Sequence, residues 1–319
     1  MTRVIDKAIK RITLGDAEIH QSCTVGLPDP QLETRVWLEG LGDPLDITNN
    51  HVVACASPFT VGIGLNREQN RQAERRRLSV KFRKRDGDQS LLAKVTLRRA
   101  ETLTGARQEL SLFHIRSCEN YCRPRPLLLA YELYNAFERW RTDRNPEIRM
   151  SMLGARSMTA FFICPRPVVL VSAIDGPTRN IFPMNLLGCI SEGYFAFALN
   201  SLRKAAPLVK RAGRVALSSI PFKHAGLVRQ LGKNHRLESA DWDRLPFTTK
   251  PSTVLGLPVP QFALRVREMH IEVVSELGSH TLFFARLLHD ERLGDELQFC
   301  MIHGIYQAWR LSMLRRSAG

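Results

Sequence analysis

Three segments in the second half of the chain carry polar or charged side chains that could bind a ligand or exchange a proton. Asn200-Ser201 and Arg203-Lys204 stand at the start of a segment with helical spacing. Helix N-termini and cations both stabilise phosphate, although such a pair of cations also occurs on ordinary exposed surfaces. Pro183-Met184-Asn185 supplies an amide. His280, just before an apolar run, supplies a group that can exchange a proton near neutral pH.

The segments that must position these residues are predicted to be mostly strands. Strands are expected over 168–174, 180–190, 193–199, 214–220, 260–274, 281–289 and 297–309, with one helix over 204–212. Pro207 lies in the first turn of that helix, where proline is tolerated, and Gly213 ends it. Antiparallel strands with one inserted helix favour a closed barrel over an α/β sheet.

The first half of the chain repeats part of this pattern. Residues 46–66 align with 180–200 without a gap, and Cys55 with Cys189 is one of five identical pairs. Common ancestry of the halves is the interpretation that we favour. The alternative is that two unrelated β-rich segments share only their strand spacing.

Two later blocks align in the same order but at a larger offset. Residues 112–120 match 282–290, and 137–141 match 306–310. The offset between the aligned blocks rises from 134 to 170, so the second half must contain about 36 additional residues. They fit within the polar, Pro- and Gly-containing stretch between Pro221 and Gln261, which is predicted to be a long loop or excursion.

The charge of the chain raises a different class of function. The formal net charge is +15, and residues 71–85 contain eight Lys or Arg against one Glu. A nucleic-acid binder could present such a run. However, Leu78, Val80 and Phe82 alternate with polar residues as in a half-buried strand with a solvated face. Phe82 is also the only aromatic side chain there, so base stacking is disfavoured.

Several other classes of site lack their motifs. The seven cysteines include no C-x-x-C, and Cys118 and Cys122 have no second pair nearby, so we expect no metal site and reduced thiols in the cytoplasm. The apolar run 161–174 is broken by Pro165-Arg166-Pro167, and we expect neither a membrane span nor a secretory signal. Gly62-x-Gly64 lies within a predicted strand, not in a nucleotide-binding loop.

The second half resembles the flavin reductase-like family, whose fold is the FMN-binding split barrel. The resemblance covers about 160–310. It is carried by an ordered set of segments: Pro165-Arg166-Pro167 before an apolar strand, Asp175-Gly176, Asn180 to Asn185, Ser191, Ala198 to Lys204, and Gly278-Ser279-His280-Thr281. The fold expected from it is mainly β with inserted helices. We predict two split β-barrel domains in tandem: 1–150, diverged and with an N-terminal extension, and 151–319, which binds flavin.

The resemblance also implies roles for individual residues. Pro183, Met184 and Asn185 would contact the flavin ring, and Asn200, Ser201, Arg203 and Lys204 would hold the phosphate. His280 would stand near the flavin and the nicotinamide as the catalytic residue. The cofactor would be FMN or FAD, with NADH or NADPH as co-substrate.

Two departures from the family pattern concern the phosphate site and a loop. Ala205-Ala206 replace a hydroxyl-bearing residue at the helix start, and Glu192-Gly193 replace paired prolines. Family members form dimers with FMN at the interface. A duplicated chain could form that pair within itself, the first half contributing Asn49, Asn50, His51, Asn66 or Arg67.

The predicted function is therefore an NAD(P)H:flavin reductase that supplies reduced flavin to a partner monooxygenase, as a monomer or a homodimer. Three alternatives remain open at this point. The barrel could bind flavin or another ligand without catalysis, the basic chain could bind nucleic acid, or the scaffold could serve a different flavin-dependent enzyme.

Overall fold

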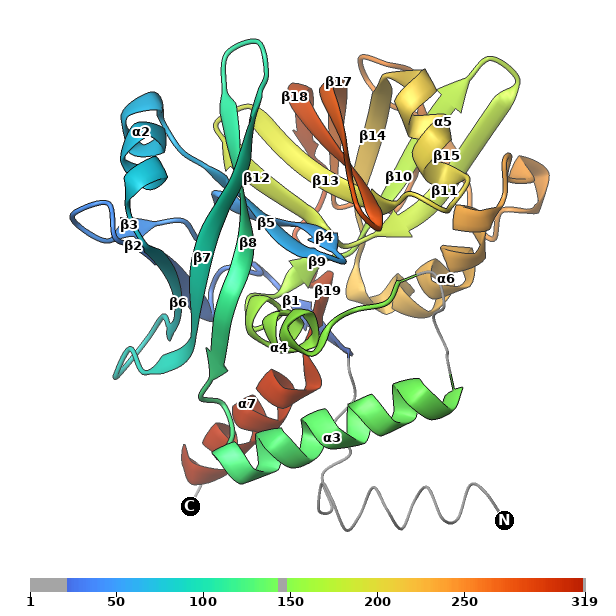
Figure 1. Ribbon diagram of the computed structural model, residues 1–319. Coiled ribbons are helices and arrows are strands. Elements are labelled where there is room, and N and C mark those ends of the chain that lie inside the picture. The colour runs from blue at the N-terminus through green and yellow to red at the C-terminus, as the bar shows by residue number, and fades with distance from the viewer. Residues whose placement is uncertain (1–21, 143–147, 318–319) are drawn as a thin grey trace.

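The computed structural model describes residues 22–142 and 148–317. Two seven-stranded antiparallel sheets lie side by side in it, one from each half of the chain (Figure 1). The first contains β2 (Thr34–Glu39), β3 (Leu45–Asp46), β4 (His51–Ala56), β5 (Phe59–Gly64), β6 (Leu78–Lys84), β7 (Leu91–Thr104) and β8 (Glu109–Asn120). The second contains β10 (Val169–Asp175), β11 (Thr178–Met184), β12 (Leu187–Ser191), β13 (Tyr194–Asn200), β14 (Arg214–Ser219), β17 (Arg265–Leu277) and β18 (His280–Arg292).

The two sheets have the same topology. Their strand orders are β3-β2-β6-β7-β8-β5-β4 and β11-β10-β14-β17-β18-β13-β12. In each, one helix enters after the fourth strand in chain order, α2 (Arg67–Arg75) in the first and α5 (Ala205–Ala212) in the second. The fold is thus mainly β with two split-barrel domains in tandem, as the sequence predicts.

Irregularities in the ladders also coincide. The β7–β8 pair has bulges between Thr96 and Leu97 and between Arg99 and Glu101. The β17–β18 pair has its bulges between Glu268 and Met269 and between Ile271 and Val273, with the same spacing. Bulges change the bend of a strand, so the two long hairpins curl alike.

One block of the sequence alignment is displaced by two residues. That alignment sets Leu112 against Leu282. In the structure, however, Leu112 pairs with Gly62, and Phe284 pairs with Ala196, which is the residue aligned with Gly62. The structural counterpart of Leu112 is therefore Phe284. Side chains alternate between the faces of a strand with a period of two. A slip of two residues therefore keeps every apolar side chain on its correct face, and the pattern cannot reveal it.

A third, small sheet joins distant parts of the chain. It consists of β1 (Cys23–Leu27), β19 (Gln298–Ile302) and β9 (Arg166–Pro167). The helices α3 (Arg125–Thr142), α4 (Met152–Phe161) and α7 (Gly304–Ser317) lie on the same side of the molecule as this sheet (Figure 1). The prediction of a strand over 297–309 was wrong beyond β19, because the chain turns into α7 and buries Tyr306 against the first core.

The predicted excursion is present between β14 and β17. It contains η1 (Phe222–His224), α6 (Ala225–Gln230), η2 (Leu231–Arg236), η3 (Trp242–Arg244), β15 (Thr249–Pro251) and β16 (Pro258–Pro260). Asn180 Nδ2 donates to the carbonyl oxygens of Asn234 and Leu237, both at 3.0 Å, and Asn234 Nδ2 donates to Ile181 O at 2.7 Å. The excursion therefore covers the edge strand β11, which would otherwise expose unpaired backbone groups.

The two halves share a core of their own. It is formed by Val52, Ala54, Leu110 and Leu112 of the first half with Ile190, Tyr194, Ala196, Ala198, Leu282 and Phe284 of the second. Glycines allow the backbones to meet here. A Cβ on Gly64 would lie 1.9 Å from Ile190 O, and one on Gly188 would lie 2.2 Å from His51 O. The N-terminal extension, expected before the first barrel, lies outside the described residues.

Candidate functional site

A cavity of about 1440 Å³ opens between α3, α4 and the second barrel. The lining includes Asn185 and Leu186 from the β11–β12 connection and His280 from the start of β18. Ala56, at the end of β4, brings the first half to the same cavity. Two of the residues predicted from the sequence, Asn185 and His280, are thus brought together at the junction of the halves.

His280 is held by a chain of hydrogen bonds that crosses this junction. The Ser57 N–H donates to Ser279 Oγ at 3.0 Å, and Ser279 Oγ lies 2.8 Å from His280 Nδ1. The Ala56 N–H also points to His280 Nδ1, at 3.5 Å. With Nδ1 accepting, the imidazole proton resides on Nε2. The ring is 5% exposed, and burial lowers the pKa of His280 to about 4. At neutral pH it is an uncharged N–H donor.

The backbones of the two halves meet tightly at this point. The Ser279 N–H donates to Ser57 O at 2.8 Å. Gly278 has φ +56°, and a Cβ there would lie 2.3 Å from Ser57 O. Sequence reasoning missed Ala56, Ser57 and Ser279. Gly278 and Ser279 directly precede His280 in the sequence, but only the fold shows that Gly278 lies against the Ser57 backbone.

In the segment 183–185, two residues hold the end of β11 in place and the third reaches the cavity. Asn185 Nδ2 lies 3.4 Å from Met301 Sδ. Pro183 O accepts a hydrogen bond from His235 Nε2 at 2.6 Å, and the Met184 side chain is 5% exposed, within the second core. Burial, followed by the charge of Arg203, lowers the pKa of His235, although the Pro183 carbonyl opposes that shift. Pro183 and Met184 therefore fix the strand end, and Asn185 faces the cavity.

The predicted phosphate segment lies beside His280 but outside the cavity lining. Asn200 pairs with His280 across β13 and β18, and its side chain accepts from the Leu202 N–H at 2.9 Å. Ser201 Oγ lies 3.1 Å from Thr281 Oγ1 and 3.4 Å from Glu276 Oε2, a carboxylate that would oppose a phosphate. Of the predicted site residues, Pro183, Met184, Asn200, Ser201, Arg203 and Lys204 are not among the described residues that line the cavity.

The helix that follows has a lysine at its N-terminus. Lys204 occupies the N-cap position of α5 with no side-chain cap hydrogen bond. Ala205 and Ala206, which replace the hydroxyl-bearing residue of the family, are 0% and 2% exposed and pack in the second core. A ligand at this helix start would thus meet Lys204 but few free backbone N–H groups, because the Ala206 N–H already donates to Arg203 O at 3.2 Å and Pro207 has no N–H.

The first-half residues suggested as partners lie elsewhere. Asn66 caps α2 in a capping box with Gln69, which occupies its side chain. Arg67 is the first residue of that helix. Asn49 and His51 line a separate cavity. The first half reaches the large cavity through Ala56, through residues 118–121 at the end of β8, and through α3 instead.

Residues 161–306 match the model of the flavin reductase like domain. This part of the chain is similar to the flavin reductase like family. The match includes Asn185, His280 and the segment between β13 and α5. No curated protein matches the chain at significant similarity.

Solved structures that are similar to the chain include three flavin proteins. An FMN-binding protein from Thermus thermophilus is 24% identical, over 40% of this chain and 71% of that one, with a TM-score of 0.36. An NADH:FAD oxidoreductase from Streptomyces globisporus is 15% identical, over 47% and 88%, with a TM-score of 0.42. The styrene monooxygenase flavin reductase from Pseudomonas putida is 20% identical, over 46% and 91%, with a TM-score of 0.37.

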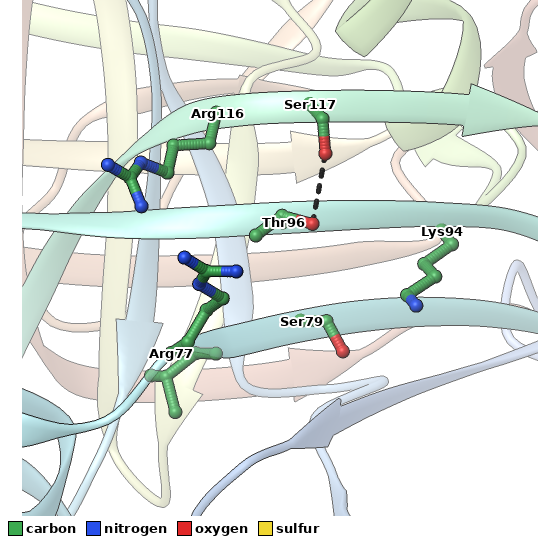
Figure 2. Close-up of a pocket in the computed structure, with 7 residues that line it drawn as sticks. Arg77, Ser79, Lys94, Thr96, Arg116 and Ser117 are labelled. Carbon is green, nitrogen blue, oxygen red and sulfur yellow. Dashed lines mark hydrogen bonds between the residues drawn. The ribbon is translucent and has the colours of Figure 1, made fainter.

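The basic run 71–85 contributes to a shallow hollow on the first sheet. Figure 2 shows Arg77, Lys94 and Arg116 around it, on three neighbouring strand segments. Ser117 Oγ donates to Thr96 Oγ1 at 3.0 Å within it. The described lining contains no aromatic residue. Leu78, Val80 and Phe82 are buried, which confirms the alternation of a half-buried strand with a solvated face.

Two expectations about other kinds of site can be compared with the structure. No group of three or more His, Cys, Asp or Glu that could hold a metal ion occurs among residues 22–142 and 148–317. None of the helices that the structure describes is long and apolar enough to span a bilayer.

Three buried histidines make the stability of the protein depend on pH. Burial lowers the pKa of His303 to about 3 and that of His280 to about 4, and burial with the neighbouring Arg166 lowers that of His51 to about 3. Because the unfolded chain binds these protons near pH 6.5 and the folded chain does not, the free energy of unfolding falls as the pH falls below 6.5. Between pH 7.5 and 5.0 we expect each histidine to contribute a loss of about 2 kcal/mol.

Denaturant unfolding at the two pH values measures this loss. His303→Gln should reduce the difference between them, since one of the three groups no longer titrates. A difference that is unchanged in this variant would contradict the assignment for His303.

Proposed function

We propose that the chain is a flavin-binding oxidoreductase that transfers a hydride from NADH or NADPH to FMN or FAD held at the cavity of Asn185 and His280. One observation carries the proposal. Asn185 and His280, far apart in the sequence, line one cavity within the segment that matches the flavin reductase like domain. The reduced flavin would then serve a partner monooxygenase.

The residues of the cavity suit the isoalloxazine ring of a flavin nucleotide better than they suit the phosphate of that nucleotide. A volume of about 1440 Å³ exceeds the ~300–1,000 Å³ of common ligand pockets, and the lining combines apolar side chains with a few polar groups. The Asn185 amide and the uncharged His280 N–H can hydrogen-bond to ring heteroatoms. The phosphate would meet Lys204 at the α5 N-terminus, but also the carboxylate of Glu276.

The protein has few chemical tasks in this reaction. A bound flavin supplies the hydride acceptor. Asn185 would orient the ring, and His280 would donate a hydrogen bond where negative charge develops during reduction. The Ser57 N–H donates to Ser279 Oγ, so the Ser279 hydroxyl donates to His280 Nδ1 and the imidazole proton stays on Nε2. Walls formed by α3 and α4 would limit access of water to the reacting atoms.

A non-catalytic flavin or ligand binder is the second candidate. The engagement of Ser201 with Thr281 and Glu276 favours it, because that hydroxyl is not directed to a phosphate. The visible spectrum separates the two proposals. Flavin should bind to the pure protein, and NADH or NADPH should bleach it under anaerobic conditions. Bound flavin that neither nucleotide bleaches would favour the second candidate, and absence of flavin binding would contradict both.

Single substitutions test the positions of ring and phosphate. Asn185→Ala and Lys204→Ala should each raise the dissociation constant for FMN about tenfold, since one hydrogen bond to a ligand is worth about 1–2 kcal/mol. Fluorescence quenching of FMN measures the constant. Arg211→Ala, in the last turn of α5 and paired with Asp175, is the matched control for charge and should leave the constant unchanged. If neither variant weakens binding, the site assignment is wrong.

A further inference from the structure

A second cavity lies between the two halves, away from the proposed flavin site. Its volume is about 390 Å³, and its lining includes Asn49 and His51 from the first half and Cys189 and Arg267 from the second. In the alignment of the two repeats, His51 stands where Asn185 stands and Cys189 where Cys55 stands. The cavity is therefore the counterpart, in the other half of the pseudo-dimer, of the cavity at Asn185.

A buried arginine without a carboxylate partner lines this cavity. Arg166 is 4% exposed. Its Nη2 lies 3.0 Å from His51 Nε2 and 3.4 Å from Phe161 O, and its Nε has no hydrogen-bond partner within the part of the chain that the structure describes. A buried guanidinium with no counter-charge is costly, by several kcal/mol. Such a group is stable when an anion joins it.

His51 does not compensate this charge. Its Nδ1 bonds to Ile47 O at 2.7 Å, so Nδ1 carries the proton and Nε2 accepts from Arg166. Burial and the charge of Arg166 lower the pKa of His51 to about 3, which keeps the ring neutral. His51 fixes the orientation of the Arg166 side chain and leaves its charge in place.

Two further arginines of the cavity share a single carboxylate. Arg265 bonds to Asp290 through Nε at 2.5 Å and Nη2 at 2.6 Å, and Arg267 Nε reaches the same carboxylate at 3.3 Å. Arg267 also lies over the Phe195 ring, with its Cζ 5.3 Å from the centroid. This pair of arginines therefore retains one unit of positive charge.

The acidic residues of the lining already have other partners. Asp295 pairs with Arg292, and Glu296 pairs with Lys223 at 2.7 Å. Asp29 Oδ1 accepts from the Gln31 N–H at 2.9 Å. Because a backbone N–H is neutral, Asp29 keeps its negative charge, and these groups together retain one net positive charge.

We propose that this cavity binds a small anionic ligand through phosphate or carboxylate oxygens, with Arg166 and Arg267 as its main contacts. The planar guanidinium donates two parallel hydrogen bonds to either group. The cavity is near the lower size limit for ligand pockets, so it suits a ligand much smaller than a flavin nucleotide. This site is separate from the proposed function and does not depend on it.

Inorganic phosphate and malonate are the two probes, each titrated into the full chain at constant ionic strength set with chloride. Isothermal titration gives the dissociation constant, and the midpoint of thermal unfolding should rise with either ligand. A preference for one probe identifies phosphate or carboxylate as the chemistry. Arg166→Gln and Arg267→Gln should each raise the dissociation constant at least tenfold.

Arg116→Gln is the matched control, because it removes an arginine from the exposed hollow of Figure 2. It should leave both titrations unchanged. If Arg166→Gln does not fold, Arg267→Gln carries the test. The proposal is overturned if neither probe binds, if both cavity variants bind as the unchanged protein does, or if the control variant loses binding equally. FMN affinity, measured alongside, should be the same in Arg267→Gln, which separates this site from the flavin cavity.

Discussion

Gly64→Ala is expected to lower the free energy of unfolding by about 3 kcal/mol or more, which is above the usual range for overpacking. The reason lies in the contact between the two halves. A Cβ on Gly64 would be 1.9 Å from the carbonyl oxygen of Ile190 and 2.8 Å from its carbonyl carbon. Both atoms belong to backbone, so no rotamer change can relieve the clash. The strands β5 and β12 must separate, and the shared core at Ile190 opens with them.

Thermal and denaturant unfolding measure this effect. A loss of 3 kcal/mol corresponds to a fall of about 5 °C in the melting temperature for a chain of this length. Gly62→Ala is the matched control in the same strand, because its Cβ would meet the Leu110 and Val52 side chains at 2.9 and 3.0 Å, and these can shift. Gly226→Ala, in α6 with no atom within 4 Å, should be neutral or slightly stabilising. Equal losses at Gly64 and Gly226 would contradict this account of the interface.

Much of the second barrel could be predicted from the sequence because its signals are local. Apolar spacing located β10, β13, β14 and β18, and Gly213 ends α5 with φ +63° as a left-handed residue should. Gly62 and Gly64 lie within β5, as predicted. Such signals depend on the pleat of one strand or the cap of one helix, so they need no knowledge of the partner element.

The failures concern contacts between distant elements. The slip at Leu112 preserves the side-chain faces and is therefore invisible to a pattern of period two. The chain after Ile302 forms α7 because Tyr306 can bury against the first barrel, which a local pattern does not encode. Likewise, α4 reaches the wall of the large cavity by packing against β7 and β8 of the first barrel, a contact that a local pattern does not encode. The candidate site was predicted as single residues, Asn185 and His280, and the fold supplied Ala56, Ser57 and Ser279.

His280→Ala is expected to reduce the rate of flavin bleaching by NADH or NADPH about 100-fold, the usual cost of losing one preorganised donor from an active site. The uncharged His280 N–H faces the cavity at neutral pH because the pKa of the ring is lowered to about 4. Stopped-flow absorbance under anaerobic conditions measures the rate at saturating FMN, so that weaker binding does not contribute.

Two variants separate a role in the reaction from a role in packing. Ser279→Ala removes the donor to Nδ1, so the imidazole can adopt either tautomer, and we expect an intermediate loss of about tenfold. His270→Ala, on the exposed face of β17, should keep the full rate. Since no carboxylate contacts the His280 ring among the described residues, the rate should stay constant from pH 8 down to about 5 and fall only near the pKa of about 4. A rate that falls near pH 6.5 instead would mean that the ring titrates at its ordinary pKa, and would contradict the claim that burial keeps His280 neutral down to about pH 5.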